Sequence, residues 1–392
     1  MTPAARVETA IGLLDGVIAS ALAKGPPADR ILADWFKANR FAGSKDRRAI
    51  RELVYRAIRA CGPIPQTGRA ALLRLAEEDP SLLLLFDGSA YGPPPLAEGE
   101  LVAEGGLAPA WLTERLERAG IEGEEAAALL GRAPLDIRVN TLKADHASLA
   151  LPESGEPLAA AQGLRLPPGT AVEQWDAYAQ GLIEVQDGGS QLACEAVAAS
   201  PGETVIDLCA GAGGKTLALA AAMANQGTLV AADTDRTRLG RLAPRAARAG
   251  ALVAETVLLD PDRELERLAA WRGKADAVLV DAPCSGTGTW RRNPEARWRL
   301  DAASLGRVMA LQRHLLAVAA DLVRPGGRLI YVTCSLLDEE GAEQAAAFLA
   351  DHPGWRAEAP SLPLGRPRGP GLRLTPLHDG TDGFFIARLA KP

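Results

Sequence analysis

Residues 204–224 read TVIDLCAGAGGKTLALAAAMA, a short apolar strand followed by a glycine-rich turn and a helical stretch. Glycine lets the backbone turn sharply and approach a ligand closely. The dinucleotide fingerprint G-x-G-x-x-G has lost its last glycine to Thr216, and a P-loop would need a glycine where Cys209 stands. The next strand ends in an acid, Asp233, which is well placed for ribose hydroxyls. This arrangement suits a nucleoside without a pyrophosphate, such as S-adenosylmethionine; an inert tight turn is the alternative.

Further apolar, strand-like segments follow, separated by helical stretches: 228–233, 257–260, 276–281 and 328–334. Strands that alternate with helices are typical of a doubly wound α/β sheet with parallel strands. Ligands bind such sheets at the carboxyl ends of the strands. The polar residues that fall at these ends are Asp233, Asp260, Asp281 and Cys334. We therefore expect a Rossmann-like α/β fold whose functional edge carries these side chains.

Two cysteines end two of the predicted strands, Cys284 in VLVDAPCSGTG (278–288) and Cys334 in RLIYVTCSL (328–336). One free cysteine at a strand end is usually a small buried apolar residue, but two at one edge favour chemistry. A thiolate can add to C6 of a pyrimidine and turn the ring into an enamine that is methylated at C5. An acid near N3 neutralises the developing charge, and a base then removes the C5 proton. Asp281, beside Cys284, is a candidate acid.

With these motifs the chain resembles the RsmB/NOP (NSUN) family of RNA cytosine-5 methyltransferases. The matching segments are EVQDGGSQLA (184–193), DLCAGAGGKT (207–216), ADTDRTRL (232–239), DAPCSGTGTWRRNPEARW (281–298), YVTCSLLDEEG (331–341) and DGTDGFFIARL (379–389). The family's loop commonly reads CAAPGGK, and here Gly211 and Ala212 replace Ala-Pro. Both replacements are small, so we expect activity to be retained.

The resemblance implies a class I S-adenosylmethionine-dependent methyltransferase acting on C5 of a cytosine in RNA. Cys334 would be the C6 nucleophile, Cys284 would assist elimination and release, and Asp281 would contact the N3 edge beside the cofactor's methionine end. The residues expected to bind S-adenosyl-L-methionine are Cys209, Ala210, Gly211, Ala212, Gly213, Gly214, Lys215, Asp233 at the ribose, Asp260 near the adenine, and Asp281. Asp260 could instead cap a helix at 262–270, and Lys215 could be a solvated residue on the first helical turn.

Three parts are expected along the chain. Residues 1–95 read as helical, and 30–60 within them partly resembles the NusB-like domain of RsmB-type enzymes. Residues 106–172 resemble the family's small α+β RNA-binding subdomain; its strand at 135–143 presents Arg138 and Asn140, which either touch RNA or lie on an ordinary exposed face. The catalytic domain would occupy 173–392.

RNA is the partner that the resemblance implies, most specifically small-subunit ribosomal RNA. The net charge is −6, but arginines cluster in 44–60, 235–250 and 290–300. Such clusters are often solvated helix faces; we expect 44–60 and 290–300 to hold phosphates. The alternatives are a methyltransferase of tRNA and a non-catalytic RNA-binding or ribosome assembly factor on the same fold.

The cysteines and the hydropathy bear on the compartment. Five widely spaced cysteines, none in CxxC spacing, argue against a disulfide framework and against a zinc site, so we expect no metal. No run of eighteen apolar residues occurs, and the first residues lack the features of a secretory signal. We expect a cytoplasmic protein and, from the resemblance, a monomer.

Overall fold

The computed structural model describes residues 1–392, and the chain divides into two compact units. The first contains Met1–Arg132 and Thr289–Asp301; the second contains Ala133–Gly288 and Ala302–Pro392. The two units are defined by packing, whereas the three ranges expected from the sequence are defined by function. The three functional ranges stay a prediction. None of the helices combines the length and the hydropathy needed to span a membrane.

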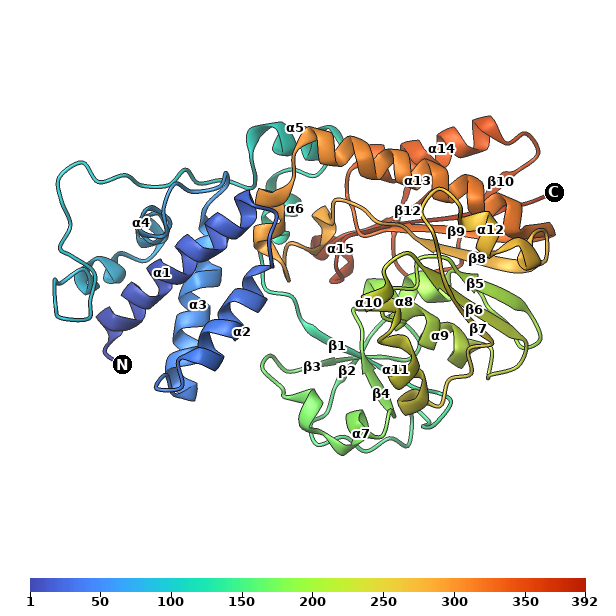
Figure 1. Cartoon of the computed structure of the whole chain (residues 1–392), viewed down its shortest axis with the longest axis horizontal. Helices are drawn as coiled ribbons and strands as arrows, with labels where there is room; N and C mark the ends of the chain where they lie inside the picture. Colours follow the sequence, from blue (N-terminus) through green and yellow to red (C-terminus); the bar gives the residue numbers. More distant parts are fainter. The chain divides into compact units, whose positions relative to one another are not determined.

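The first unit is helical (Figure 1). Its elements are α1 (Pro3–Leu22), α2 (Ala28–Ala38), α3 (Ser44–Ala60), α4 (Gly68–Glu78), η1 (Pro80–Leu85), α5 (Ala110–Arg118), α6 (Gly123–Ala128) and η5 (Pro294–Arg299). The Thr2 hydroxyl caps α1 by accepting from the amide of Ala5. Apolar residues at helical spacing on α1 and α3, such as Leu14 and Ile50, are fully buried in a common core.

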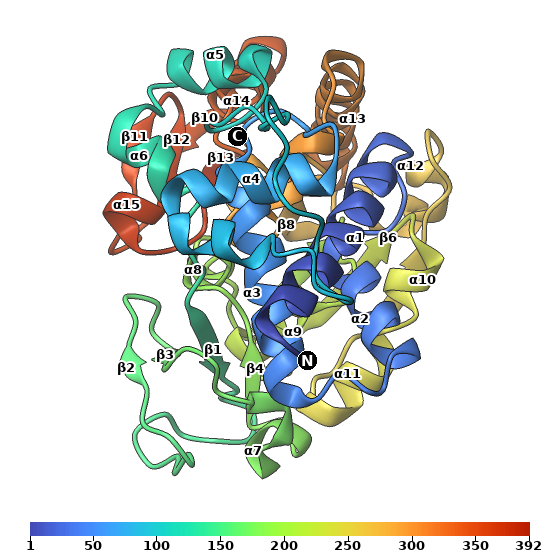
Figure 2. The same cartoon turned by 90° about the vertical axis from the view of Figure 1, so that its left-hand side faces the viewer.

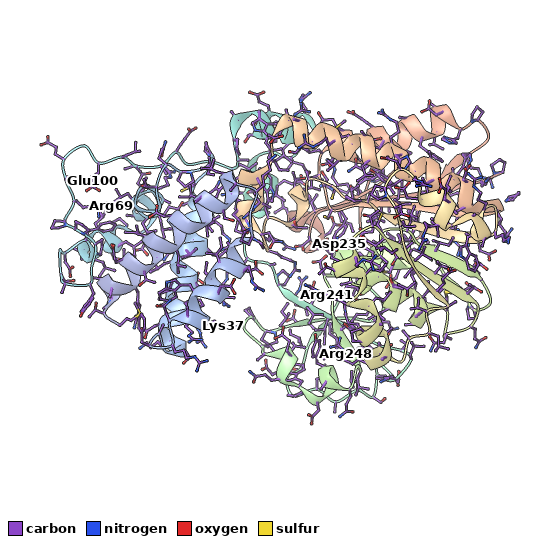
Figure 3. All side chains as sticks on the ribbon, in the orientation of Figure 1. Lys37, Arg69, Glu100, Asp235, Arg241 and Arg248 are labelled. Atoms are coloured by element: carbon purple, nitrogen blue, oxygen red, sulfur yellow. The ribbon has the colours of Figure 1, made fainter.

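An ion pair anchors the proline- and glycine-rich segment after η1, which has neither helix nor strand over 91–100. Nη2 of Arg69 lies 2.6 Å from Oε1 of Glu100 (Figure 3). The Arg69 guanidinium also stacks over Phe86, 4.8 Å from the ring centroid. Segment 91–100 is therefore a loop, and Arg69 of α4 holds it in place.

Residues Thr289–Asp301 follow the first cysteine motif but pack within the helical unit. Arg297 in η5 is fully buried and donates to the carbonyls of Ile58 and Cys61, both at 2.6 Å. Burial lowers its pKa to about 10. The expectation that the island 290–300 holds phosphates is therefore wrong for Arg297, because main-chain carbonyls occupy its guanidinium.

The second unit contains two sheets. The smaller has the order β2-β3-β1-β4 and is antiparallel (Figure 2). Its strands are β1 (Leu135–Val139), β2 (Glu156–Pro157), β3 (Gly163–Leu166) and β4 (Ile183–Val185), with η2 (Val172–Gln174) and α7 (Asp176–Ala179) between β3 and β4. Ile137, Leu166 and Ile183 form its apolar core.

The larger sheet has the order β11-β12-β13-β9-β8-β5-β6-β7, and β10 pairs with β13. Strands β5 (Thr204–Asp207), β6 (Thr228–Asp233), β7 (Glu255–Leu258), β8 (Ala275–Asp281) and β9 (Val323–Thr333) are parallel. Strands β10 (Arg356–Glu358), β11 (Arg366–Arg368), β12 (Gly371–Leu374) and β13 (Phe384–Ala390) add antiparallel pairs. Each strand predicted for this half is present, which confirms the Rossmann-like α/β fold.

Helices cover both faces of this sheet because successive strand residues point to opposite sides. Val205 packs with α8 (Gly188–Glu195), α9 (Gly214–Ala222) and α11 (Leu242–Ala249). Ile206 packs on the other side with α13 (Ala302–Leu322) and α14 (Ala342–Asp351), which run along one side of the sheet in Figure 1. The remaining elements are α10 (Arg236–Leu239), α12 (Glu264–Arg267), η3 (Ala269–Trp271), η4 (Thr287–Thr289), η6 (Asp338–Glu340) and α15 (Pro376–Asp379).

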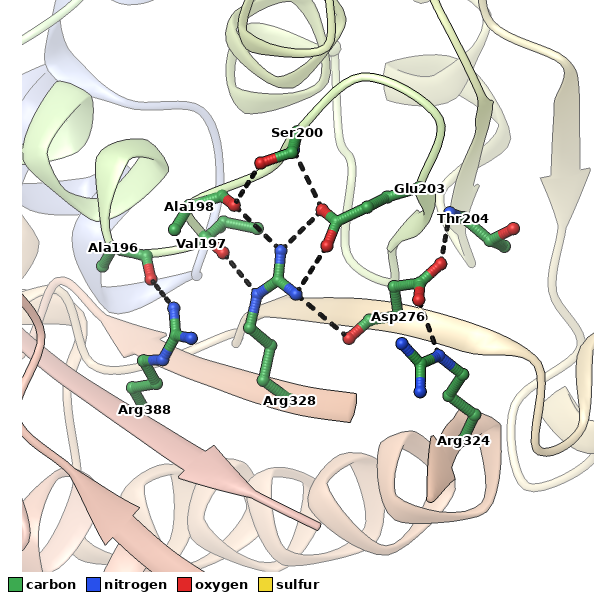
Figure 4. Close-up of polar contacts among 10 residues, drawn as sticks. All are labelled: Ala196, Val197, Ala198, Ser200, Glu203, Thr204, Asp276, Arg324, Arg328 and Arg388. Atoms are coloured by element: carbon green, nitrogen blue, oxygen red, sulfur yellow. Dashed lines mark hydrogen bonds and ion pairs between the residues drawn. The ribbon is translucent and has the colours of Figure 1, made fainter. Parts of the chain in front are cut away.

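Ion pairs join the amino-terminal ends of the central strands (Figure 4). Arg328 Nη2 lies 2.7 Å from Oε2 of Glu203, and its Nε donates to the carbonyl of Val197 at 2.7 Å. Arg324 pairs with Asp276 at 2.6 Å, and Asp276 also accepts from the amide of Thr204. The charged side chains at this edge thus pair with one another and stabilise the sheet. The polar groups predicted for function lie at the opposite, carboxyl ends of the strands.

Candidate active site

The two cysteines meet at the carboxyl ends of β8 and β9. These strands are parallel neighbours with Asp281 opposite Val332, so the residues that follow each strand lie side by side. Sγ of Cys284 lies 3.3 Å from Sγ of Cys334, and the amide of Gly288 donates to the carbonyl of Cys334 at 3.0 Å. Both thiols are partly exposed. The hydrogen bond with Cys334, together with burial, raises the pKa of Cys284 well above its ordinary value.

Lys215 and Asp281 connect the glycine loop with the first cysteine motif. Nζ of Lys215, on the first turn of α9, lies 2.6 Å from Oδ2 of Asp281 at the end of β8. Burial lowers the pKa of Lys215, but the nearby Asp281 and thiol charges outweigh it, so the net shift is upward. The Lys215 side chain is 12% exposed, which rules out the solvated alternative. The lysine therefore fixes the position of the Asp281 side chain at this edge.

The glycine loop takes a form that only glycine tolerates at two positions. Gly211 has φ 54° and Gly213 has φ 88°. A Cβ on Gly213 would lie 2.1 Å from Cδ1 of Leu242. The buried carboxylate of Asp233 accepts from the amides of Gly211 and Asp235, both at 2.7 Å. Asp233 therefore shapes the loop and lies at its edge.

The remaining loop residues predicted for the cofactor are also present at this edge. Cys209 and Ala210 follow β5, and burial raises the pKa of Cys209 well above its ordinary value. The carbonyl of Ala212 accepts from Nη1 of Arg245 at 2.9 Å, and Arg245 also pairs with Glu184 of β4 at 3.0 Å. The arginines of the island 235–250 thus brace the loop against the smaller sheet.

Asp260 lies apart from these contacts. It is exposed after β7, and its backbone carbonyl accepts from the amide of Arg263 at 3.0 Å. Helix α12 begins at Glu264 with Arg263 as its N-cap, so the alternative that Asp260 caps a helix is wrong. The structure leaves the Asp260 side chain at the carboxyl edge of the sheet without a helix to cap.

The predictions for the strand at 135–143 need correction. Arg138 and Asn140 are buried, which excludes both RNA contact and an ordinary exposed face. Asn140 donates to the carbonyls of Gly181 and Ala249 at 2.8 and 2.7 Å, and Arg138 donates to Gln186 at 2.8 Å. These side chains join β1 to its neighbours, because polar groups on a covered strand must find internal partners.

Two acids near the site were missed from the sequence. Asp207 ends β5 and is fully buried: Oδ2 accepts from the Thr216 hydroxyl at 2.6 Å, and Oδ1 has no partner. Burial raises its pKa to about 7. Glu340, also fully buried, binds the residues that follow both cysteines. The sequence signals that could have found them are an acid directly before the glycine loop, for Asp207, and an acid inside the second cysteine motif, for Glu340.

No group of three or more His, Cys, Asp or Glu side chains is arranged to hold a metal.

Comparisons with known proteins agree on one family. The model for 16S rRNA methyltransferase RsmB/F matches residues 195–390. Ribosomal RNA small subunit methyltransferase B of Erwinia tasmaniensis is 36% identical over 297 residues, which are 73% of this chain and 66% of that protein. Its namesake from Xanthomonas campestris is 34% identical over 296 residues, 75% of this chain and 63% of that protein. The chain thus spans just under two thirds of the length of these relatives.

Solved structures show the same architecture. The crystal structure of PH0851 has a TM-score of 0.76 and 26% identity, covering 100% of both chains. A methyltransferase homolog protein from Pyrococcus horikoshii has a TM-score of 0.60 and 27% identity over 72% of this chain and 99% of that one. With the family model spanning half of the sequence and the fold shared, this chain belongs to the RsmB/F family of 16S rRNA methyltransferases.

Proposed function

We propose that the protein methylates C5 of a cytosine in RNA, with small-subunit ribosomal RNA as the substrate and a covalent bond between Cys334 and C6 as the intermediate. The observation that carries this proposal is the pair of thiols, Cys284 and Cys334, 3.3 Å apart at the carboxyl ends of adjacent strands. Two free thiols held together at a ligand-binding edge suit a reaction that first makes and later breaks a sulfur–carbon bond.

The glycine loop fits S-adenosylmethionine by its own atoms. Gly214 leaves space beside the loop, because a Cβ there would meet nothing within 4 Å. Oδ1 of Asp207 is buried without a partner, as expected for an acceptor that awaits a donor such as a ligand ammonium. Cys209 to Lys215, Asp207 and Asp233 would hold the cofactor, with Asp260 near the adenine. When bound, S-adenosylmethionine would supply a sulfonium methyl group: the S–CH₃ bond breaks as the C5–CH₃ bond forms, and the cofactor is left as a neutral thioether.

The side chains divide the rest of the reaction. The Cys334 thiolate forms the bond to C6, and the C5=C6 electron pair moves toward N3. Asp281, positioned by Lys215, would meet N3 as the carboxylic acid: its proton passes to N3 as the charge develops there and returns when the ring is restored. After C5 is methylated, Cys284 would assist elimination: in its thiolate form it accepts the C5 proton and becomes a thiol, and its raised pKa makes that thiolate a strong base. The electrons of the C5–H bond restore the double bond, the S–C6 bond breaks, and Cys334 leaves as a thiolate.

A basic cavity in the helical unit is suited to hold RNA phosphates. It has a volume of about 610 Å³, and its lining includes Lys37, Arg47, Arg48 and Arg51. The guanidiniums of Arg47 and Arg51 lie 5.7 and 5.8 Å from the ring centroid of Phe36. Nε of Arg47 donates to the carbonyl of Ala42 at 2.7 Å, so the donors that phosphate oxygens would meet are its terminal nitrogens and the guanidinium of Arg51. This cavity supports the phosphate role proposed for 44–60.

The test uses Cys284→Ala with S-adenosylmethionine and a small-subunit rRNA transcript, followed by a denaturing gel. Blocked release should leave a slowly migrating protein–RNA adduct, and the double variant with Cys334→Ala should lack it. The buried Cys61→Ala is the matched control and should behave as the wild type. If the wild type transfers labelled methyl to no RNA, including tRNA, the non-catalytic binding factor becomes the better description. An active wild type without an adduct would mean that the cysteine roles are misassigned.

A further inference from the structure

Glu340 is a carboxylate buried without a cation. Its side chain is fully enclosed, at the end of η6. Oε1 accepts from the amide of Ser285 at 2.8 Å and from Nε2 of Gln312 at 3.0 Å. Oε2 accepts from the hydroxyl of Ser335 at 2.6 Å and from the hydroxyl of Ser285. All four donors are neutral, so oriented hydrogen bonds alone satisfy the two oxygens of this side chain.

The donors come from residues next to the two reacting cysteines. Ser285 directly follows Cys284, and Ser335 directly follows Cys334. Gln312, on α13, also donates to the carbonyl of Pro283 at 2.9 Å, directly before Cys284. The Glu340 side chain therefore binds the loops that follow Cys284 and Cys334 and also α13, which contacts the loop of Cys284 through Gln312.

Further hydrogen bonds close the cluster around this carboxylate. The hydroxyls of Ser335 and Thr287 lie 3.1 Å apart, and Thr287 accepts from the amide of Leu336 at 2.8 Å. The hydroxyl of Tyr331, on β9, donates to the carbonyl of Glu340 at 2.6 Å. The Glu340 backbone is thus fixed to the same strand that delivers Cys334.

A carboxylate suits this position better than any other side chain. It presents two oxygens with two acceptor positions each and no donor, which matches four donors. A glutamine of the same size would turn its NH₂ group toward two of these partners, and serine hydroxyls there would have to rotate from donating to accepting and find new acceptors for their own protons. Because an unpaired polar group inside a protein is costly, the loops would then have to move apart or rotate.

We propose that Glu340 is a positioning residue that sets the distance between Cys284 and Cys334, and that this distance permits the change from adduct formation to release. The inference rests on the proposed cytosine-5 methyl transfer. It adds that the spacing of the thiols depends on a charge that touches neither substrate nor cofactor. A displacement of about 1 Å in such a site can lower a rate by about a hundredfold.

The test compares Glu340→Gln with Glu343→Gln, a matched change at an exposed residue on α14. Thiol spacing is measured first, with phenylarsine oxide, which condenses with two neighbouring thiols and releases water. We expect the wild type and Glu343→Gln to bind the arsenical equally and Glu340→Gln to bind it at least tenfold more weakly (about one unit in log Kd). Cys284→Ala should abolish the bridging of two thiols by the arsenical, which would identify Cys284 as one of the two thiols that bind it. This measurement needs neither RNA nor cofactor.

Turnover is the second readout. For methyl transfer to the rRNA transcript, Glu340→Gln should lower kcat by about tenfold to a hundredfold and leave the KM for RNA within about twofold. If Glu340→Gln does not fold, Ser335→Ala, which removes one donor, should show a smaller loss in the same two measurements. Unchanged arsenical affinity in folded Glu340→Gln, with kcat within twofold of wild type, would overturn the proposal. If both thiols of the wild type bind the arsenical but the wild type methylates no RNA, the proposed function is refuted. The role of Glu340 in thiol spacing is then still decided by the arsenical affinities.

Discussion

Nζ of Lys215 lies 2.6 Å from Oδ2 of Asp281, and this ion pair joins the helix that follows the glycine loop to the end of β8, shortly before Cys284. The two residues are far apart in the sequence, but Asp281 ends β8 and Lys215 lies on the first turn of α9, so both reach the same edge of the sheet. In the proposed reaction, this ion pair would therefore link the binding of the cofactor to the activation of the cytosine by Asp281.

Lys215→Met should therefore weaken both functions. Asp281 would lose its cation while its side chain stays 30% exposed, so water limits the loss of folding stability to about 1–3 kcal/mol. We expect S-adenosylmethionine affinity, measured by calorimetry, to fall by about tenfold or more. Lys274→Met, at an exposed position, is the control and should bind as the wild type. Equal S-adenosylmethionine affinity in the two variants would show that Lys215 does not contribute to cofactor binding.

The glycine loop offers a matched pair of substitutions. Gly213→Ala would force a side chain into left-handed backbone and against Leu242, whereas a Cβ on Gly214 meets open space. We expect Gly213→Ala to lower the free energy of unfolding by about 1–3 kcal/mol and to impair cofactor binding. Gly214→Ala should change stability by less than about 1 kcal/mol. Urea unfolding of both variants measures the difference, and equal losses would contradict the geometry.

The buried acid Asp207 should make stability depend on pH. Its pKa is raised from 3.8 to about 7 in the folded protein, mainly by burial. Between about pH 4 and 7 the folded state therefore keeps a proton that the unfolded chain has released, so this residue's contribution to stability falls as pH rises through that window and levels off above about pH 7. The slope can reach about 1.4 kcal/mol per pH unit.

Asp207→Asn removes this titration. We expect the free energy of unfolding of the wild type to fall between pH 5 and 7 relative to that of the variant, and the difference to stay constant above about pH 7. Chemical unfolding at several pH values measures it. Parallel pH profiles for the two proteins would show that the folded-state pKa is not raised.

Arg297 should be a stability residue of the helical unit. Its guanidinium is fully buried and donates to the carbonyls of Ile58, Cys61 and Pro294. Arg297→Leu would leave buried carbonyls unpaired, at a cost of about 2–5 kcal/mol. Arg30→Leu, at an exposed position on α2, should change the free energy of unfolding by less than about 0.5 kcal/mol. Similar values for the two variants would assign Arg297 to another role.

The strands of the larger sheet could be predicted because their signals are local. Runs such as DAVLVD (276–281) are apolar and β-branched, and the glycines of the loop mark a turn that few residues can make. The candidate cofactor residues followed from the same segments, since parallel strands bring their carboxyl ends to one edge.

The roles of the buried polar residues could not be predicted. From the sequence, Arg138 and Asn140 are expected either to touch RNA or to lie on an exposed face, and the island that contains Arg297 is expected to hold phosphates, because charge and polarity alone suggest exposure. Each instead meets main-chain carbonyls or side chains, in several cases more than a hundred residues away in the chain. Burial of a polar side chain depends on which distant groups can accept its hydrogen bonds, and no local pattern records those partners.

The sequence by itself determined the α/β fold, the glycine loop and the placement of two cysteines at strand ends, because periodicity and turn chemistry act over a few residues. Only the tertiary structure decided that Cys284 and Cys334 lie 3.3 Å apart, that Lys215 pairs with Asp281, and that Glu340 holds both loops. These contacts join residues from different elements, and their distances depend on how strands and helices pack around a shared core.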